Sequence, residues 1–329
     1  MNPALSLVIP FCNVEPYLAA CLDSIIKQTF VDFEVIMIDD GSTDTSREIA
    51  DSYTRKDPRF RLFRQPNRGP GPARNAGLRH ASGRYIGFVD SDDIVAEDAY
   101  EQLIDSLQHT GSDVACGGVR RFNRERSWPS PLHEGIFDIP EKRTHITQRI
   151  ELLGDRTVWN KIYRRSFWDR NNLRFPDHIF EDAFVTVPAH VLAESVDIVT
   201  GPVYFWRQRE DGPPSITQRA LDGDVIYGRM KQIRMVSDFL ASQNLELKKA
   251  YDLVALEHDI LILLTALPNA EHAQREDIIT FARDFISRVA EGVLRELESK
   301  NAKCYRLLNE RRLNDLFQYL KSLPPTDFL

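Results

Sequence analysis

YIGFVDSDDI, residues 85–94, places three carboxylates, Asp90, Asp92 and Asp93, directly behind an apolar run typical of a buried strand. Carboxylates repel one another, so crowding them at a strand end favours a bound cation. Their hard oxygens can hold Mg²⁺ or Mn²⁺ and leave coordination positions for a diphosphate. The alternative is a helix N-cap formed by Ser91 or Asp92, with the other acids in solvent.

Strand-like and helix-like segments alternate around this stretch. We expect strands at 5–10, 33–38, 60–64, 84–89 and 113–118, and helices at about 15–27, 43–56, 72–81 and 96–109. Thr43 or Asp44 is expected to cap the second helix. The alternation predicts an α/β fold with βαβ units and a mainly parallel sheet. Ligands of such sheets lie at the carboxyl ends of the strands, where DDGSTD and DSDD fall.

The pattern changes along the second half of the chain. It is irregular from about 120 to 215, and from about 220 onward it is helical only, with apolar residues at helical spacing over 221–241, 246–266, 272–298 and 302–321. Glycine and proline cluster in REDGPPS, 209–215, which marks a boundary. We therefore expect a sheet domain at 1–217 and an all-α region at 218–329.

Composition excludes several classes of protein. The 329 residues carry a formal net charge of −7, which disfavours a nucleic-acid binder. The four cysteines are scattered without metal-like spacing and indicate reduced thiols in a cytoplasmic protein. The first residues lack the basic region of a signal peptide, and no apolar run approaches the ~18 residues of a membrane span.

Two more segments put polar residues at the expected ligand edge. VIMIDDGSTDTS, 35–46, places Asp39 and Asp40 after the second strand, where an acid can bind a base or ribose. NRGPGPARNAG, 67–77, places Arg74 and Asn75 at a helix start, where backbone can approach a ligand and Arg74 can meet a base or phosphate. Taken alone, a turn with a capping box and an ordinary glycine-proline turn explain the same residues.

The ordered series VIPFCNVEPYLAACLDSIIKQTF, DDGSTD and NRGPGPARNAGLRHASGRYIGFVDSDD resembles the family 2 glycosyltransferases, which have the nucleotide-sugar-binding glycosyltransferase-A fold. The resemblance weakens over 150–217. It implies that residues 1–217 form a single Rossmann-like glycosyltransferase-A domain that uses a UDP-sugar with Mn²⁺ or Mg²⁺. The binding roles that it implies fall on Pro10, Phe11 and Glu15 for the nucleotide pocket, Asp40 or Asp39 for uracil, Arg74 with Asn75 for the base or donor, Asp90 and Ser91 for the sugar diphosphate, and Asp92 for the metal.

Two later blocks extend the resemblance. In FPDHIFEDAFV, 175–185, Glu181 and Asp182 fall where the family has an acidic pair whose aspartate is the catalytic base of inverting members. A base must lie within about 3 Å of the attacking hydroxyl, whereas in isolation the pair reads as acids at a helix N-terminus. YFWRQREDGPPSIT, 204–217, makes Arg207, Arg209 and Ser215 candidates for closing over the diphosphate, although its Gly-Pro-Pro departs from the family pattern.

VWNKIYRRSFW, 158–168, is a further block, in which Trp159 or Lys161 is a candidate for touching the acceptor. The alternative is buried packing around Trp159 with solvated basic residues. The helical tail carries basic and aromatic residues between 300 and 321. They fit a peripheral contact with the inner face of a membrane, a homo-oligomer interface, or solvated faces around an ordinary core.

The resemblance implies inverting, metal-dependent, non-processive transfer of a hexose or N-acetylhexosamine. The acceptor would be a hydroxyl of a cell-surface glycan such as a capsule or cell-wall polysaccharide, of a teichoic-type polymer, or of a lipid-linked precursor. A catalytically degenerate scaffold that binds sugar nucleotides is one alternative. A sugar-phosphate nucleotidyltransferase is another, and IPFCNVEPYL disfavours it because this loop lacks the glycine and basic residues that grip a triphosphate.

Overall fold

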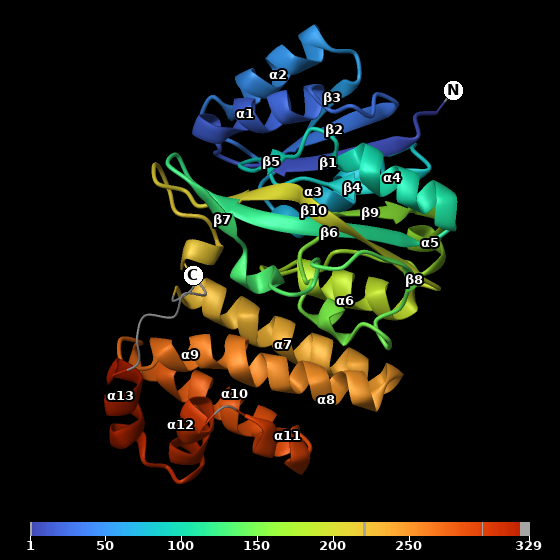
Figure 1. Ribbon diagram of the computed structural model, residues 1–329. Helices are drawn as coiled ribbons and strands as arrows, with labels where there is room; N and C mark the ends of the chain where they lie inside the picture. The colour runs from blue at the N-terminus through green and yellow to red at the C-terminus, as the bar shows by residue number, and fades with distance from the viewer. Residues whose placement is uncertain (1, 220–221, 298, 323–329) are drawn as a thin grey trace. The chain divides into compact units, whose positions relative to one another are not determined.

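The computed structural model describes residues 2–219, 222–297 and 299–322 (Figure 1). Contacts divide the chain into two compact units, one ending at Pro213 and the other beginning at Pro214. The boundary expected from the sequence lies a few residues further on, after residue 217. Three parts of the prediction lie outside the described residues. They are residue 221, where one expected helix begins, residue 298, where another ends, and the tail after residue 322.

The first unit is built on one mixed sheet. Its strands are β1 (Leu5–Phe11), β2 (Phe33–Asp39), β3 (Phe60–Arg64), β4 (Tyr85–Phe88), β5 (Ile94–Val95), β6 (Val114–Phe122), β7 (Ser127–Pro129), β8 (Glu141–Thr144), β9 (Lys161–Arg164) and β10 (Val196–Arg207). The main order is β3-β2-β1-β4-β9-β6-β10-β5. β3, β2, β1 and β4 run parallel, as do β6 and β10, whereas β9 is antiparallel to β4 and β6. The predicted α/β fold with a mainly parallel sheet is confirmed.

Helices cover this sheet. They are α1 (Glu15–Ile26), α2 (Ser46–Lys56), α3 (Pro70–Leu78), α4 (Ala99–Thr110), α5 (Arg165–Arg170) and α6 (Asp182–Leu192), with 3₁₀ turns η1 (Pro131–His133) and η2 (Ile150–Leu153). α1 packs on α2, α3 on β1 and β2, and α4 on β6, β9 and β10 (Figure 1). Every residue of β1, β2 and β4 is buried, which explains why these strands read as continuous apolar runs.

The register aligns the carboxyl ends of the central strands. Phe11, the last residue of β1, pairs with Asp39, the last residue of β2, and β4 runs parallel to β1 on its other side. The acidic turns that follow β2 and β4 therefore lie at one edge of the sheet. This edge is where parallel sheets bind their ligands.

The start of α2 differs from the prediction. The helix begins at Ser46 rather than near residue 43, and its N-cap is Thr45. Asp44 Oδ1 still accepts from the first helical amide, that of Ser46, at 3.0 Å. The helix starts later than predicted because the turn before it binds the loop after β1. Asn13 Oδ1 accepts from the Thr43 amide at 2.8 Å, and Asp44 Oδ2 accepts from the Glu15 amide at 3.1 Å.

The second unit is helical, as its apolar spacing predicts. It contains the 3₁₀ turn η3 (Thr217–Arg219), α7 (Gly223–Gln243), α8 (Leu245–Val254), the π-helical turn η4 (Ala255–Asp259), α9 (Ile260–Ala266), α10 (His272–Arg288), α11 (Glu291–Glu296), α12 (Ser299–Asn309) and α13 (Leu313–Ser322). The two long helices expected over 272–298 and 302–321 are each broken once, after Arg288 and after Asn309. No helix in the described part of the chain is long and apolar enough to cross a bilayer.

Candidate active site

The turn after β4 and the start of α6 meet at one buried guanidinium. Arg74 on α3 donates through Nη2 to Asp90 Oδ1 at 2.6 Å. Its Nη1 donates to Glu181 Oε1 and lies 3.1 Å from Asp182 Oδ1. The Arg74 side chain is 3% exposed, whereas those of Asp90 and Asp182 are 33% and 22% exposed. Three carboxylates thus share one cation, and two of them remain open to an incoming molecule.

Close packing of α3 against the 175–181 segment builds this cluster. Asn75 donates through Nδ2 to the carbonyl of Phe175 at 2.7 Å and accepts from the amide of Phe175 at 3.1 Å. Gly71 has no room for a side chain, because a Cβ there would collide with the backbone of that segment. The glycine-rich stretch that reads as a turn in the sequence therefore brings Arg74 against the second acidic pair. The Arg74 guanidinium contacts these carboxylates, and its expected contact with the base or the donor stays a prediction.

The cluster is short of positive charge. Burial raises the pKa of Asp182 to about 6, with Arg74 opposing the shift and Glu181 adding to it. Burial also raises the pKa of Asp90 to about 6, against Arg74 and with the charges of Asp182 and Asp92 adding to it. The pKa of Glu181 is raised by burial as well. A carboxylate whose pKa lies this close to neutrality is suited to take a proton from a bound hydroxyl.

Asp92 and Asp93 are held by the end of β10 and the residues that follow it. Arg209 Nε donates to Asp92 Oδ2 at 2.7 Å, and Arg207 Nε donates to the carbonyl of Asp92 at 2.5 Å. The Arg207 amide donates to Asp93 Oδ1 at 2.7 Å. Both guanidinium groups lie over the ring of Tyr17, 5.2 and 5.4 Å from its centroid. Two segments predicted separately, the DSDD turn and the aromatic-arginine stretch, thus meet.

Asp39 and Asp40 are bound within the protein. Asp39 is 0% exposed, and its Oδ1 accepts from the Ser42 amide at 2.8 Å. Asp40 is 3% exposed and accepts from the amides of Arg68 and Gly69 at 3.0 and 2.8 Å. Both carboxylates therefore shape the loops at the ligand edge of the sheet. Their expected pairing with uracil stays a prediction.

The remaining candidates occupy several places. Pro10 and Phe11 are buried at the end of β1, and Ser91 is 5% exposed. Glu15 begins α1, and its carboxylate accepts from the turn before α2 at 3.2 Å. Ser215 belongs to the second unit, where its hydroxyl accepts from an amide of η3 at 3.3 Å. Their expected contacts with a nucleotide or diphosphate stay predictions.

Asp92 is the candidate metal ligand. Within residues 2–219, 222–297 and 299–322, no group of three or more His, Cys, Asp or Glu side chains is arranged to hold a metal ion. Mg²⁺ in proteins is commonly held by one or two carboxylates together with substrate phosphates. The Asp92 carboxylate, 15% exposed and paired with Arg209, is a donor of this kind.

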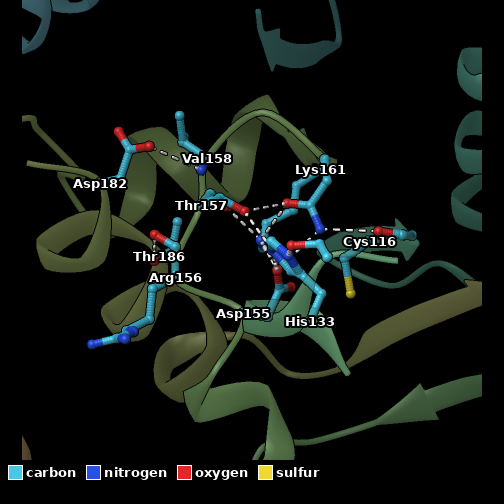
Figure 2. A network of polar contacts seen from close by, with 12 residues as sticks. Cys116, His133, Asp155, Arg156, Thr157, Val158, Lys161, Asp182 and Thr186 are labelled. Atoms are coloured by element: carbon cyan, nitrogen blue, oxygen red, sulfur yellow. Dashed lines mark hydrogen bonds and ion pairs between the residues drawn. The ribbon is translucent and has the colours of Figure 1, made fainter. Parts of the chain in front are cut away.

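Lys161 is fully buried, so the expectation that it touches the acceptor is wrong. Its ammonium donates to Asp155 Oδ1 at 2.6 Å and to the carbonyl of Thr157 at 2.5 Å. Trp159 is 5% exposed and stacks on Tyr204, with ring centroids 4.2 Å apart, in agreement with the packing alternative. That alternative is wrong in expecting Lys161 to be solvated. Sequence reasoning missed this buried polar cluster (Figure 2). The sequence carries little signal for it, because β9 is a four-residue strand with a basic residue at each end.

Comparison with known proteins gives a consistent result. The model of the family described as Glycosyl transferase family 2 matches residues 6–170. The uncharacterized glycosyltransferase EpsJ of Bacillus subtilis is 34% identical over 223 residues, which are 66% of this chain and 64% of EpsJ. The poly(ribitol-phosphate) beta-glucosyltransferase of Bacillus spizizenii is 30% identical over 251 residues, 74% of this chain and 38% of that protein. The chain thus spans less than two thirds of either relative.

A solved structure resembles the whole chain. It is the crystal structure of residues 1–349 of S. aureus TarS in complex with UDP-GlcNAc, which matches with a TM-score of 0.74 and 22% identity. The match covers 98% of this chain and 91% of that one. At this level of identity the likeness establishes a shared fold.

Proposed function

Since the chain belongs to glycosyl transferase family 2, we propose that it transfers one sugar residue from a UDP-sugar to a hydroxyl of a separate acceptor, with inversion at the anomeric carbon. The family membership confirms the resemblance found in the sequence. The observation that carries the proposal is the meeting of Asp90, Glu181 and Asp182 at Arg74. It joins the turn expected to bind the donor to the pair expected to supply the base.

The proposed acceptor is a polyol-phosphate polymer of the teichoic type. One relative is named for poly(ribitol-phosphate), and the structural neighbour TarS was crystallised with UDP-GlcNAc. These names support a hexose or N-acetylhexosamine carried by UDP as the donor. Cell-surface glycans and lipid-linked precursors are the competing acceptors, and the experiment below separates them.

In the proposed reaction Asp182 is the general base. It takes the proton of the acceptor hydroxyl while the hydroxyl oxygen bonds to the anomeric carbon, on the face opposite the diphosphate. The bond from that carbon to the diphosphate breaks, and UDP leaves with the bonding electrons. Because burial raises the pKa of Asp182 to about 6, the free enzyme needs a pH above that value to hold its base ionised.

Asp92 would hold Mg²⁺ or Mn²⁺ together with the donor diphosphate, and such a cation neutralises charge on the leaving UDP. Arg209 and Arg207 bind Asp92 and its turn, and their guanidinium groups match phosphate geometry. We propose that they bind the diphosphate when the cation occupies the carboxylate. Asp40 is proposed to pair with uracil, and its carboxylate also holds the loop at Arg68 and Gly69.

The test is transfer by the purified protein. It is incubated with Mn²⁺ and a panel of UDP-sugars, alone and with poly(ribitol-phosphate), a neutral polysaccharide or a lipid-linked precursor, and both UDP release and labelled product are measured. We expect transfer to the polyol-phosphate polymer from one UDP-sugar. Transfer to another acceptor would overturn the acceptor assignment, and no UDP release in any mixture would overturn the proposed reaction.

A further inference from the structure

A buried polar cluster adjoins the segment that contacts the proposed base, and it has no role in the reaction as written (Figure 2). Its side chains come from η1, from the 155–160 segment, from the start of β9 and from α6. The members are His133, Asp155, Thr157, Asn160, Lys161 and His190. Each is at most 9% exposed, so the cluster is closed to substrate.

The charges of this cluster balance. Lys161 Nζ lies 2.6 Å from Asp155 Oδ1, and both side chains are 0% exposed. Although burial acts in the opposite direction, Lys161 holds the pKa of Asp155 below its ordinary range. Burial lowers the pKa of His133 to about 3 and also lowers that of His190, so both rings are neutral at pH 7. One ammonium and one carboxylate remain, and their charges cancel.

The cluster reaches the base through a single peptide group. Lys161 Nζ donates to the carbonyl of Thr157 at 2.5 Å, and the amide of Val158 donates to Asp182 Oδ2 at 3.3 Å (Figure 2). That carbonyl and that amide belong to the same planar trans peptide, so they point in opposite directions. Fixing the carbonyl on the ammonium therefore aims the N–H at the carboxylate. The ammonium also polarises the N–H, because hydrogen bonds in a chain strengthen one another.

A second bond ties the same turn to the helix of the base. Thr186 follows Asp182 by one turn of α6, on the same face of the helix. Its Oγ1 donates to the carbonyl of Arg156 at 3.1 Å. Two hydrogen bonds, made by Asp182 and Thr186, therefore join the start of α6 to the 156–158 segment.

We infer that Lys161 is a positioning residue for the proposed base: its ammonium, held by Asp155, fixes the Thr157–Val158 peptide and thereby orients the Asp182 carboxylate toward the acceptor hydroxyl. The inference rests on the proposed function. The titratable and charged groups that face Asp182 are Arg74 from α3, Asp90 after β4, Glu181 at the start of α6, and Lys161 and Tyr163 from β9.

The test is Lys161→Met, assayed for transfer and for UDP binding. We expect kcat to fall by about tenfold to a hundredfold, the loss typical of a misplaced reacting group, while the Kd of UDP stays unchanged. Since Lys161 lowers the pKa of Asp182, its loss should also move the acid limb of the pH profile of kcat to higher pH. Lys161→Arg keeps the charge and the donor, and should return the limb toward that of the wild type.

Arg229→Met is the matched control. It breaks another buried ion pair, Arg229 with Asp259 at 2.9 Å in the second unit, and so removes a buried cation without touching the base. We expect kcat and the acid limb of Arg229→Met to match the wild type. Wild-type kcat and an unmoved limb in Lys161→Met would overturn the inference and leave the proposed function standing. No transfer by the wild type would overturn both.

If Lys161→Met does not fold, Thr186→Val tests the inference instead. The substitution keeps the shape of the side chain and removes the bond to Arg156 without exposing or burying a charge. We expect a severalfold lower kcat with an unchanged Kd for UDP. A kcat equal to that of the wild type would overturn the inference.

Discussion

Two buried polar clusters adjoin the 156–158 segment, and they differ in charge balance. Around Arg74, three carboxylates share one guanidinium, and burial raises the pKa of Asp182 to about 6. Around Lys161, a single carboxylate meets the ammonium, and the pKa of Asp155 is lowered despite its burial. A cluster that satisfies its charges within the protein is a scaffold. One that is left short of positive charge has capacity for a cation and for a proton.

The largest expected effect is the loss of turnover in Asp182→Asn. The amide cannot take the proton of the acceptor, so kcat should fall by about 10²- to 10⁴-fold, the range for removing a general base. UDP binding, measured by calorimetry, should stay close to that of the wild type. Asp169→Asn, at an exposed acid of α5, is the control and should keep full turnover. Full turnover in Asp182→Asn would rule out this residue as the base.

Removing the acid of the balanced cluster should cost stability. Asp155→Ala leaves the ammonium of Lys161 buried without its partner, so the free energy of unfolding should fall by about 3–5 kcal/mol. Denaturant unfolding measures this change. Asp51→Ala, at the exposed pair with Arg55, should change it by less than about 1 kcal/mol. Equal losses in the two variants would contradict the structural role assigned to the Lys161 cluster.

A smaller effect is expected on metal-dependent binding. Asp92→Ala removes the candidate metal ligand, so the affinity for UDP in Mn²⁺ should fall by at least about tenfold. In EDTA the variant and the wild type should bind UDP alike. Asp105→Ala, at an exposed acid of α4, is the control. If Asp92→Ala kept the full effect of Mn²⁺, the ligand would have to be another residue.

The smallest effect is a gain in stability. The raised pKa of Asp182 means that between its ordinary value of 3.8 and about 6 the folded protein holds a proton that the unfolded chain has lost. Stability therefore falls as pH rises through this window, and the cost is fully present above it. Asp182→Asn should therefore be more stable than the wild type at pH 7.5, and this gain should shrink as the pH is lowered toward 4. Thermal unfolding at both pH values checks this, and a less stable variant at pH 7.5 would contradict it.

The sequence predicts the first half of the fold better than the second. β1, β2 and β4 are buried on both faces, and such strands leave continuous apolar runs that are easy to read. β10 shows no such run, because it alternates buried and exposed stretches and shifts register near Gly201. β9 is a four-residue strand that opens with a buried lysine. Neither pattern is typical of a strand within a central sheet.

The candidate site divides in the same way. The acidic turns stand at strand and helix ends, so Asp90, Asp92 and Asp182 can be picked out from local pattern and family order. The meeting of the carboxylates at Arg74 cannot, because Glu181 lies 107 positions from Arg74 in the sequence and Asp182 follows it. The same holds for Lys161, whose burial depends on Asp155 and on the packing of α6. Local pattern finds the charges, and tertiary packing decides which of them are balanced.

The most direct test of the central claim is a calorimetric titration of the wild-type protein with UDP, in Mn²⁺ and then in EDTA. The claim is that the acidic edge of the sheet takes a divalent cation together with a nucleotide diphosphate. It predicts clear binding of UDP in Mn²⁺ and a marked loss of affinity in EDTA. Equal affinity in both conditions, or no binding in either, would contradict it.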